Sequence, residues 1–72
     1  MLMSMSKKIR TILLERNMNI KDLSIKMDCK PKHLYNKLGS DKFTEQELIE
    51  IANALDCDYD GIFTLRDTGK KI

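Results

Sequence analysis

The sequence predicts a mainly α-helical domain of four to five helices, followed by a short C-terminal β-strand. Three observations support this prediction. Apolar residues recur every three or four positions over residues 9–55, which is the period of an amphipathic helix. Capping residues and turn formers divide this stretch into separate helices. After residue 58 the apolar period shortens, and the segment 62–65 is rich in residues that favour β-strands.

The first helix is expected over residues 6–16, with Ser6 as its N-cap. Residues 1–5 before it are expected to form a flexible N-terminus. The inner face of the helix follows from its apolar spacing, with an aliphatic arginine stem at the edge: Ile9, Ile12, Leu13 and Arg16. The basic residues near its start either reach a phosphate or are only solvated: Lys7, Lys8 and Arg10.

The next two helices are short and separated by a tight break. Asn19 can cap the second helix, and Asp22 favours its first turn. Pro31 suits the first turn of the third helix, which is expected over residues 30–38 with Gly39 ending it. Between them Asp28 falls where a left-handed residue is needed, a conformation that aspartate tolerates well. Two helices joined in this way form a helix-turn-helix unit.

The third helix has two distinct faces. Its apolar face is expected to point inward and consists of Pro31, Leu34, Tyr35 and Leu38. Its opposite face consists of Lys32, His33, Asn36 and Lys37. Lys30 and Lys32 lie at the positive end of the helix dipole, which costs roughly 0.3–1 kcal/mol per charge unless an anion lies nearby. This placement favours a nucleic-acid partner, although lysines on a solvated face are a simpler alternative.

The fourth helix has the clearest start signal in the chain. Thr44 followed by Glu47 forms a capping box, and Phe43 before it can pack on Leu48 as a hydrophobic staple. The helix is expected to end near Leu55. Its glutamates are best interpreted as solvating charges that match the helix dipole.

The C-terminal segment, residues 59–72, is expected to hold one short strand and a basic tail. No other strand is evident in this helical chain, so the strand would leave an open edge. We expect it to pair with the same strand of a second copy across a two-fold axis. The residues expected to make this dimer contact are Ile62, Phe63 and Leu65. A fifth short helix packed on the core is the competing interpretation.

Charge is distributed unevenly along this single short domain. The formal net charge is only +2, yet residues 19–42 hold six lysines against three aspartates. Residues 43–60 hold six acids and no base. One basic face of this kind is expected where a protein meets a polyanion.

Several classes of function are excluded by what the sequence lacks. Cys29, Cys57 and His33 are not spaced as zinc ligands, so no metal is expected and the cysteines are interpreted as core residues. No nucleophile with a nearby base and no phosphate-binding loop is present, so neither an enzyme nor a cofactor is expected. The chain has no apolar run that could span a membrane and no signal peptide, which predicts a cytoplasmic protein.

The segments IKDLSIKMDCKPKHLYNKL and TEQELIEIANALDCD together resemble the Xre/Cro-type phage repressor helix-turn-helix DNA-binding family. The resemblance covers residues 6–58 and implies a helical bundle of the lambda-repressor-like type. A strand after the helices is similar to the dimerising C-terminal strand of Cro-like proteins. The chain departs from the family pattern at Ser24 and Asp28, and at Lys37, where Leu38 takes the inward role one place later.

The resemblance also implies which residues contact DNA. The positions that read base edges in the major groove correspond to Lys32, His33 and Asn36, with Lys37 close enough to join them or touch a phosphate. The positions expected at the phosphate backbone are Asn19, Ile20, Lys21, Lys30, Lys42 and Thr44.

The predicted function is sequence-specific recognition of double-stranded DNA by a transcriptional regulator, a homodimeric Cro-like repressor. Its two copies would read half-sites about 34 Å apart. Neither a membrane nor a small-molecule substrate is expected as a partner. The alternative is a protein-interaction module, such as an antitoxin or a subunit that binds a larger regulator, which would expose an apolar patch.

Overall fold

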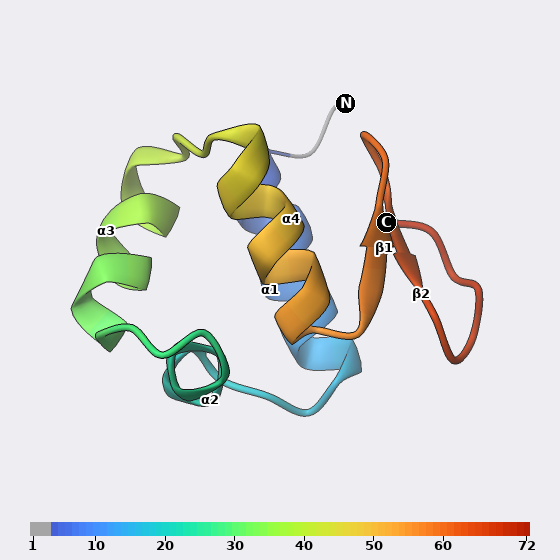
Figure 1. Ribbon diagram of the computed structural model, residues 1–72, viewed down its shortest axis with the longest axis horizontal. Coiled ribbons are helices and arrows are strands. Elements are labelled where there is room, and N and C mark those ends of the chain that lie inside the picture. Colours follow the sequence, from blue (N-terminus) through green and yellow to red (C-terminus); the bar gives the residue numbers. More distant parts are fainter. Residues whose placement is uncertain (1–3) are drawn as a thin grey trace.

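The computed structural model describes residues 4–72 and contains helices followed by a small hairpin (Figure 1). The prediction of four helices and a C-terminal strand is confirmed, whereas the alternative of a fifth helix is wrong, since residues 63–65 are extended. In chain order the elements are α1 (Met5–Glu15), α2 (Ile20–Lys26), α3 (Pro31–Ser40), α4 (Glu45–Ala54), β1 (Cys57–Tyr59) and β2 (Phe63–Leu65).

One apolar core unites all of these elements. In Figure 1, α4 stands between α3 on one side and the hairpin on the other. Residues of every element are buried between them, and the hairpin contributes Phe63, which is 0 % exposed. The buried apolar residues are Ile9, Ile12, Leu13, Leu23, Leu34, Leu38, Leu48, Ile51, Ala52, Leu55, Cys57, Phe63 and Leu65.

The start of α1 differs from the prediction. Ser4, not Ser6, is the N-cap, and its hydroxyl accepts the Lys7 N–H at 3.2 Å. Ser6 is instead buried, and its Oγ lies 2.7 Å from the carbonyl oxygen of Leu38. Residues 4 and 5, which were placed in the predicted flexible N-terminus, thus form the cap and the first position of α1, while residues 1–3 lie outside the described part of the chain.

The end of α3 also differs from the prediction, because the helix passes through Gly39 and ends at Ser40. Asp41 then takes the left-handed conformation with φ of 54°. Its Oδ1 accepts the Ser6 N–H at 2.8 Å, which satisfies an N–H at the start of α1 that has no partner within the helix. The position of the helix end is thus set by a contact between residues 35 positions apart.

Each helix is followed by an Asn or Asp residue in the left-handed conformation. The predicted turn residue, Asp28, has φ of 54° and is confirmed in this role. These side chains tolerate positive φ better than other residues with a Cβ, because they form local hydrogen bonds. The four residues are Asn17, Asp28, Asp41 and Asp56.

The C-terminal strand has a partner within the chain. β1 and β2 pair antiparallel, with Asp58 opposite Thr64. On the other edge of β2, Phe63 and Ile72 exchange backbone hydrogen bonds of 3.2 and 2.9 Å. The prediction of an unpaired strand was wrong because the acidic segment 56–60 does not resemble a strand in sequence. The predicted boundary after residue 58 falls inside β1.

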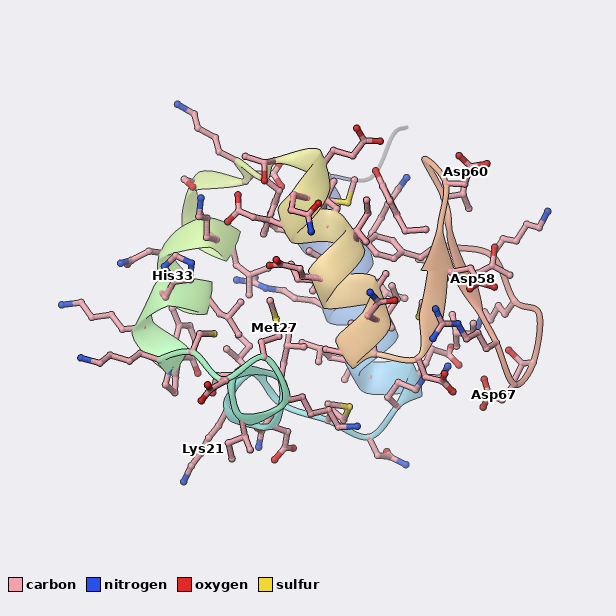
Figure 2. All side chains as sticks on the ribbon, viewed as in Figure 1. Lys21, Met27, His33, Asp58, Asp60 and Asp67 are labelled. Atoms are coloured by element: carbon pink, nitrogen blue, oxygen red, sulfur yellow. The ribbon has the colours of Figure 1, made fainter. Side chains whose placement is uncertain are left out.

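Three exposed aspartates lie at the end of the molecule opposite α2 and α3. Figure 2 shows Asp58, Asp60 and Asp67 at the hairpin end, whereas Lys21 and His33 lie on α2 and α3 at the other end. Arg16, Arg66 and Lys70 pair with acids at the hairpin end, whereas only Lys37 of the six lysines in residues 19–42 forms an ion pair within residues 4–72.

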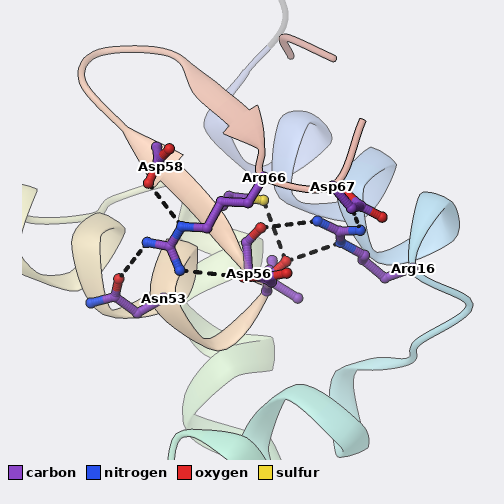
Figure 3. Close-up of polar contacts among 8 residues, drawn as sticks. Arg16, Asn53, Asp56, Asp58, Arg66 and Asp67 are labelled. Carbon is purple, nitrogen blue, oxygen red and sulfur yellow. Dashed lines mark hydrogen bonds and ion pairs between the residues drawn. The ribbon is translucent and has the colours of Figure 1, made fainter. Parts of the chain in front are cut away.

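Two arginines, Arg16 and Arg66, form ion pairs and hydrogen bonds around the hairpin (Figure 3). The guanidinium of Arg16 forms an ion pair of 2.7 Å with Asp67 and donates to the carbonyls of Leu55 at 3.0 Å and Asp56 at 2.9 Å. Its hydrogen bond holds the pKa of the Asp67 carboxyl below the ordinary value. Arg66 forms a second ion pair with Asp58, at 2.8 Å.

Candidate nucleic-acid interface

The helix-turn-helix unit consists of α2, α3 and the turn between them. Asn19 and Asp22 form a reciprocal capping box, with the Asp22 N–H donating to Asn19 Oδ1 at 2.8 Å. In the turn, the Cys29 N–H donates to the Ser24 carbonyl at 3.0 Å. Buried Leu23 and Leu34 anchor the two helices in the core, so the orientation of α3 is fixed by packing.

The outer face of α3 is exposed and polar. Lys32, His33 and Asn36 are all exposed, and no hydrogen bond or ion pair joins their side chains to others in residues 4–72. Figure 2 shows His33 on this helix, at the end of the molecule away from the hairpin. These three side chains are therefore free to donate and accept hydrogen bonds from a partner.

Lys37 lies on a different side of α3, toward α4. Its Nζ lies 3.0 Å from Oε2 and 3.1 Å from Oε1 of Glu47. The Thr44 backbone N–H and the Lys37 ammonium both hydrogen-bond to this carboxylate and lower the pKa of Glu47. The ammonium of Lys37 thus ties α3 to the start of α4, apart from the other predicted base-contacting residues.

The residues predicted to contact phosphates lie at the starts of α2, α3 and α4 and in the loop before α4. Five of them are exposed, whereas Ile20 is half-buried and packs on the core. The Asn19 and Thr44 oxygens accept hydrogen bonds within their own capping boxes, which leaves the lysines as the free donors. No ion pair within residues 4–72 involves Lys21, Lys30 or Lys42.

Tyr35 is a residue whose position the apolar pattern predicted wrongly. Its side chain was expected in the core, but it is 58 % exposed, and Pro31 is exposed too. The ring lines a hollow of about 370 Å³ together with Arg10 of α1 and Asn19 of α2. Leu34 and Leu38 take the inward positions of α3, and Tyr35, one residue after Leu34, falls at the edge of this narrow buried stripe.

No helix among residues 4–72 is long and apolar enough to cross a membrane. The same residues contain no group of three or more histidine, cysteine, aspartate or glutamate side chains that could hold a metal ion.

Comparison with known proteins agrees with this geometry. The family model of the Cro/C1-type HTH DNA-binding domain matches residues 8–67, which include α2, α3, α4 and the hairpin. Neither the comparison with curated proteins nor that with solved structures finds a match. The family model covers most of the chain, and the chain belongs to the Cro/C1-type helix-turn-helix DNA-binding domain family.

Proposed function

We propose that this protein is a sequence-specific regulator of transcription that binds double-stranded DNA as a homodimer and acts as a repressor. The observation that supports this proposal best is the set of unpaired cations around the helix-turn-helix unit. Of the six lysines in residues 19–42, only Lys37 forms an ion pair within residues 4–72. Free lysines on one side of a domain release counterions when they meet the phosphate backbone, which supplies affinity.

In the proposed complex, α3 enters the major groove. The Asn36 amide matches the donor and acceptor edge of adenine, and the Lys32 ammonium matches the acceptors of guanine. His33 adds a further donor. Phosphate contacts by Lys21, Lys30 and Lys42 would position the helix without reading sequence.

Lys37 has a separate role in this proposal. Its ion pair with Glu47 holds α3 against the start of α4. Lys37 would thus orient α3, and it would reach DNA only by exchanging Glu47 for a phosphate.

The homodimer is proposed to form through the outer edge of β1. Both edges of β2 are occupied within the chain, and Phe63 and Leu65 face the core, so these residues are not available as first predicted. The backbone groups of Tyr59 that face away from β2 have no backbone partner in residues 4–72, whereas Cys57 at the other end of β1 is fully buried. Ile62 in the loop after β1 is 48 % exposed and would add apolar contact.

The test is selection from a random pool of duplex DNA at two salt concentrations, followed by sequencing of the bound fraction. We expect an enriched inverted repeat whose half-sites are about 34 Å apart, and an affinity that falls steeply with salt. Absence of enrichment together with absence of salt-dependent binding would overturn the proposal.

A protein-interaction role is the second candidate, and one observation favours it. Leu14, which is 78 % exposed, lines the same hollow as Tyr35 and forms a small apolar surface. Such a surface suits a protein partner. This candidate would gain weight only if the selection above yielded no DNA binding. In either case we propose a binding role without catalysis, in the cytoplasm as the sequence predicts.

A further inference from the structure

The three arginines of the chain differ in their surroundings. Arg16 and Arg66 are both engaged by carboxylates near the hairpin, at 2.7 and 2.8 Å. Arg10, on α1, is exposed, and no side chain in residues 4–72 forms an ion pair or hydrogen bond with it. Arg10 is thus the arginine whose charge is not paired with a carboxylate in residues 4–72.

The position of Arg10 relates it to the helix-turn-helix unit. Its side chain lines the hollow of about 370 Å³ together with Asn19 and Ile20 at the start of α2 and with Tyr35 of α3. No acidic residue lines this hollow. A residue of α1 therefore stands beside both helices of the proposed DNA interface, with no carboxylate of the hollow to neutralise it.

Tyr35 supports the same interpretation from the other wall of the hollow. Its ring is 58 % exposed, and its hydroxyl has no hydrogen-bond partner within residues 4–72. Tyr35 directly precedes Asn36, the proposed reader of adenine, and lies about 100° from it around the axis of α3, on the side that lines the hollow. A tyrosine hydroxyl is a common donor to phosphate oxygens.

We propose that Arg10 and Tyr35 contact one phosphate-backbone strand of the DNA, which extends the interface from the helix-turn-helix unit onto α1. Arg10 supplies a charge-assisted hydrogen bond to a phosphate, and the apolar wall formed by Leu13 and Leu14 supports its aliphatic stem. Tyr35 donates a neutral hydrogen bond beside it. This inference rests on the proposed function, since it names further contacts of the same DNA.

The experiment measures binding of wild-type protein and three variants to the selected duplex and to an unrelated duplex, over a range of salt concentrations. Arg10→Gln removes the charge, and Tyr35→Phe removes only the hydroxyl. Lys71→Gln is the matched control, because this exposed lysine lies in the C-terminal tail and forms no ion pair within residues 4–72. Thermal melting of each variant checks that the fold is retained.

For Arg10→Gln we expect affinity to fall about three- to tenfold on both duplexes, and the slope of log K against log salt to shrink by about 0.9. For Tyr35→Phe we expect a smaller loss with an unchanged slope, because no charge is removed. Lys71→Gln should bind like the wild type. Ethylation of one backbone phosphate should hinder the wild type but not Arg10→Gln.

The outcomes separate this inference from the proposed function. If the wild type binds the duplex with salt dependence but Arg10→Gln and Tyr35→Phe match Lys71→Gln, the contact from α1 is refuted and the regulator remains. If the wild type binds no duplex at any salt concentration, the proposed function fails as well. The apolar hollow would then be assigned to a protein partner.

Discussion

At the scale of single residues, Asp41 meets two constraints at once, a left-handed backbone and a hydrogen-bond acceptor for Ser6. Its backbone is left-handed, with φ of 54°, and its carboxylate accepts hydrogen bonds of 2.8 Å from both the N–H and the Oγ of Ser6. Glycine would adopt the left-handed conformation without strain but would lack the hydrogen-bond acceptor. Alanine would lack the acceptor and would also be strained in this conformation. Asparagine keeps the acceptor and tolerates the conformation.

Replacing Asp41 with alanine is therefore expected to lower the free energy of unfolding by about 1–3 kcal/mol, since the cap is lost and alanine tolerates the left-handed conformation less well than aspartate. Asp41→Asn is the control and should lose less than about 1 kcal/mol. Urea unfolding followed by circular dichroism measures both. Equal midpoints for Asp41→Ala and the wild type would show that this contact does not stabilise the fold.

Asn36 is the residue on which sequence reading is proposed to depend. Because its side chain is exposed, Asn36→Ala should fold normally, cost roughly 1–3 kcal/mol of binding and relax the preference at one base position. Lys21→Gln should instead weaken binding to all sequences alike. Repeating the selection with each variant measures the difference, and a uniform loss for Asn36→Ala would mean that it contacts no base.

At the scale of elements, the hairpin is joined to the helices by a few polar contacts as well as by its buried face. Arg16 at the end of α1 contacts Asp67 after β2 and the carbonyls that follow α4, so one side chain joins three elements. Lys70 and Glu15 add an ion pair of 2.6 Å between the tail and α1. These contacts fix the hairpin on the side of the molecule opposite α3.

Because of the Arg16–Asp67 ion pair, we expect part of the free energy of unfolding to be lost at acidic pH. Arg16 lowers the pKa of Asp67 in the folded state below its ordinary value of 3.8. The stabilisation is therefore present above that ordinary value and is lost as the pH falls through the lower, folded-state pKa. Thermal melting between pH 7 and pH 2 should show this loss.

In the variant Asp67→Asn, the melting temperature should be lower at neutral pH and should fall less as the pH is lowered. Glu47, whose pKa is lowered as well, remains in this variant and accounts for part of the residual fall. If both proteins lost stability in parallel from pH 7 to pH 2, the Arg16–Asp67 pair would have no energetic role.

At the scale of the whole molecule, α3 and the hairpin lie on opposite sides of α4, and we propose a different role for each. The helix-turn-helix unit exposes unpaired lysines, and the hairpin end exposes Asp58, Asp60 and Asp67 (Figure 2). Such an arrangement lets a second copy join at the hairpin without covering α3. It also directs the acidic end away from the phosphate backbone.

The proposed dimer predicts opposite effects for substitutions at two adjacent residues, the exposed Ile62 and the buried Phe63. Ile62→Asp changes an exposed side chain, so it should leave the melting temperature nearly unchanged but yield monomers in sedimentation velocity. Phe63→Asp buries a charge at a fully buried site and should unfold the protein, at a cost of at least the roughly 3–5 kcal/mol of a Phe→Ala truncation. A dimer that persists in Ile62→Asp would remove this loop from the interface.

The sequence by itself determined the features that depend on neighbouring residues. The capping boxes of Asn19 and Thr44 and the turn at Asp28 need only residues within about one helical turn, so their signals survive in the sequence. Apolar spacing likewise identified most of the core. The exposed donors Lys32, His33 and Asn36 followed from the face opposite that core.

Only the tertiary structure decided the features that join distant residues. Asp41 ends α3 because Ser6 lies beside it, and Cys57–Tyr59 is a strand because Phe63–Leu65 pairs with it. Arg10 stands beside the helix-turn-helix unit only through helix packing. A pair of this kind is favourable only after the chain has brought its members together, and neither member carries a local signal of the other.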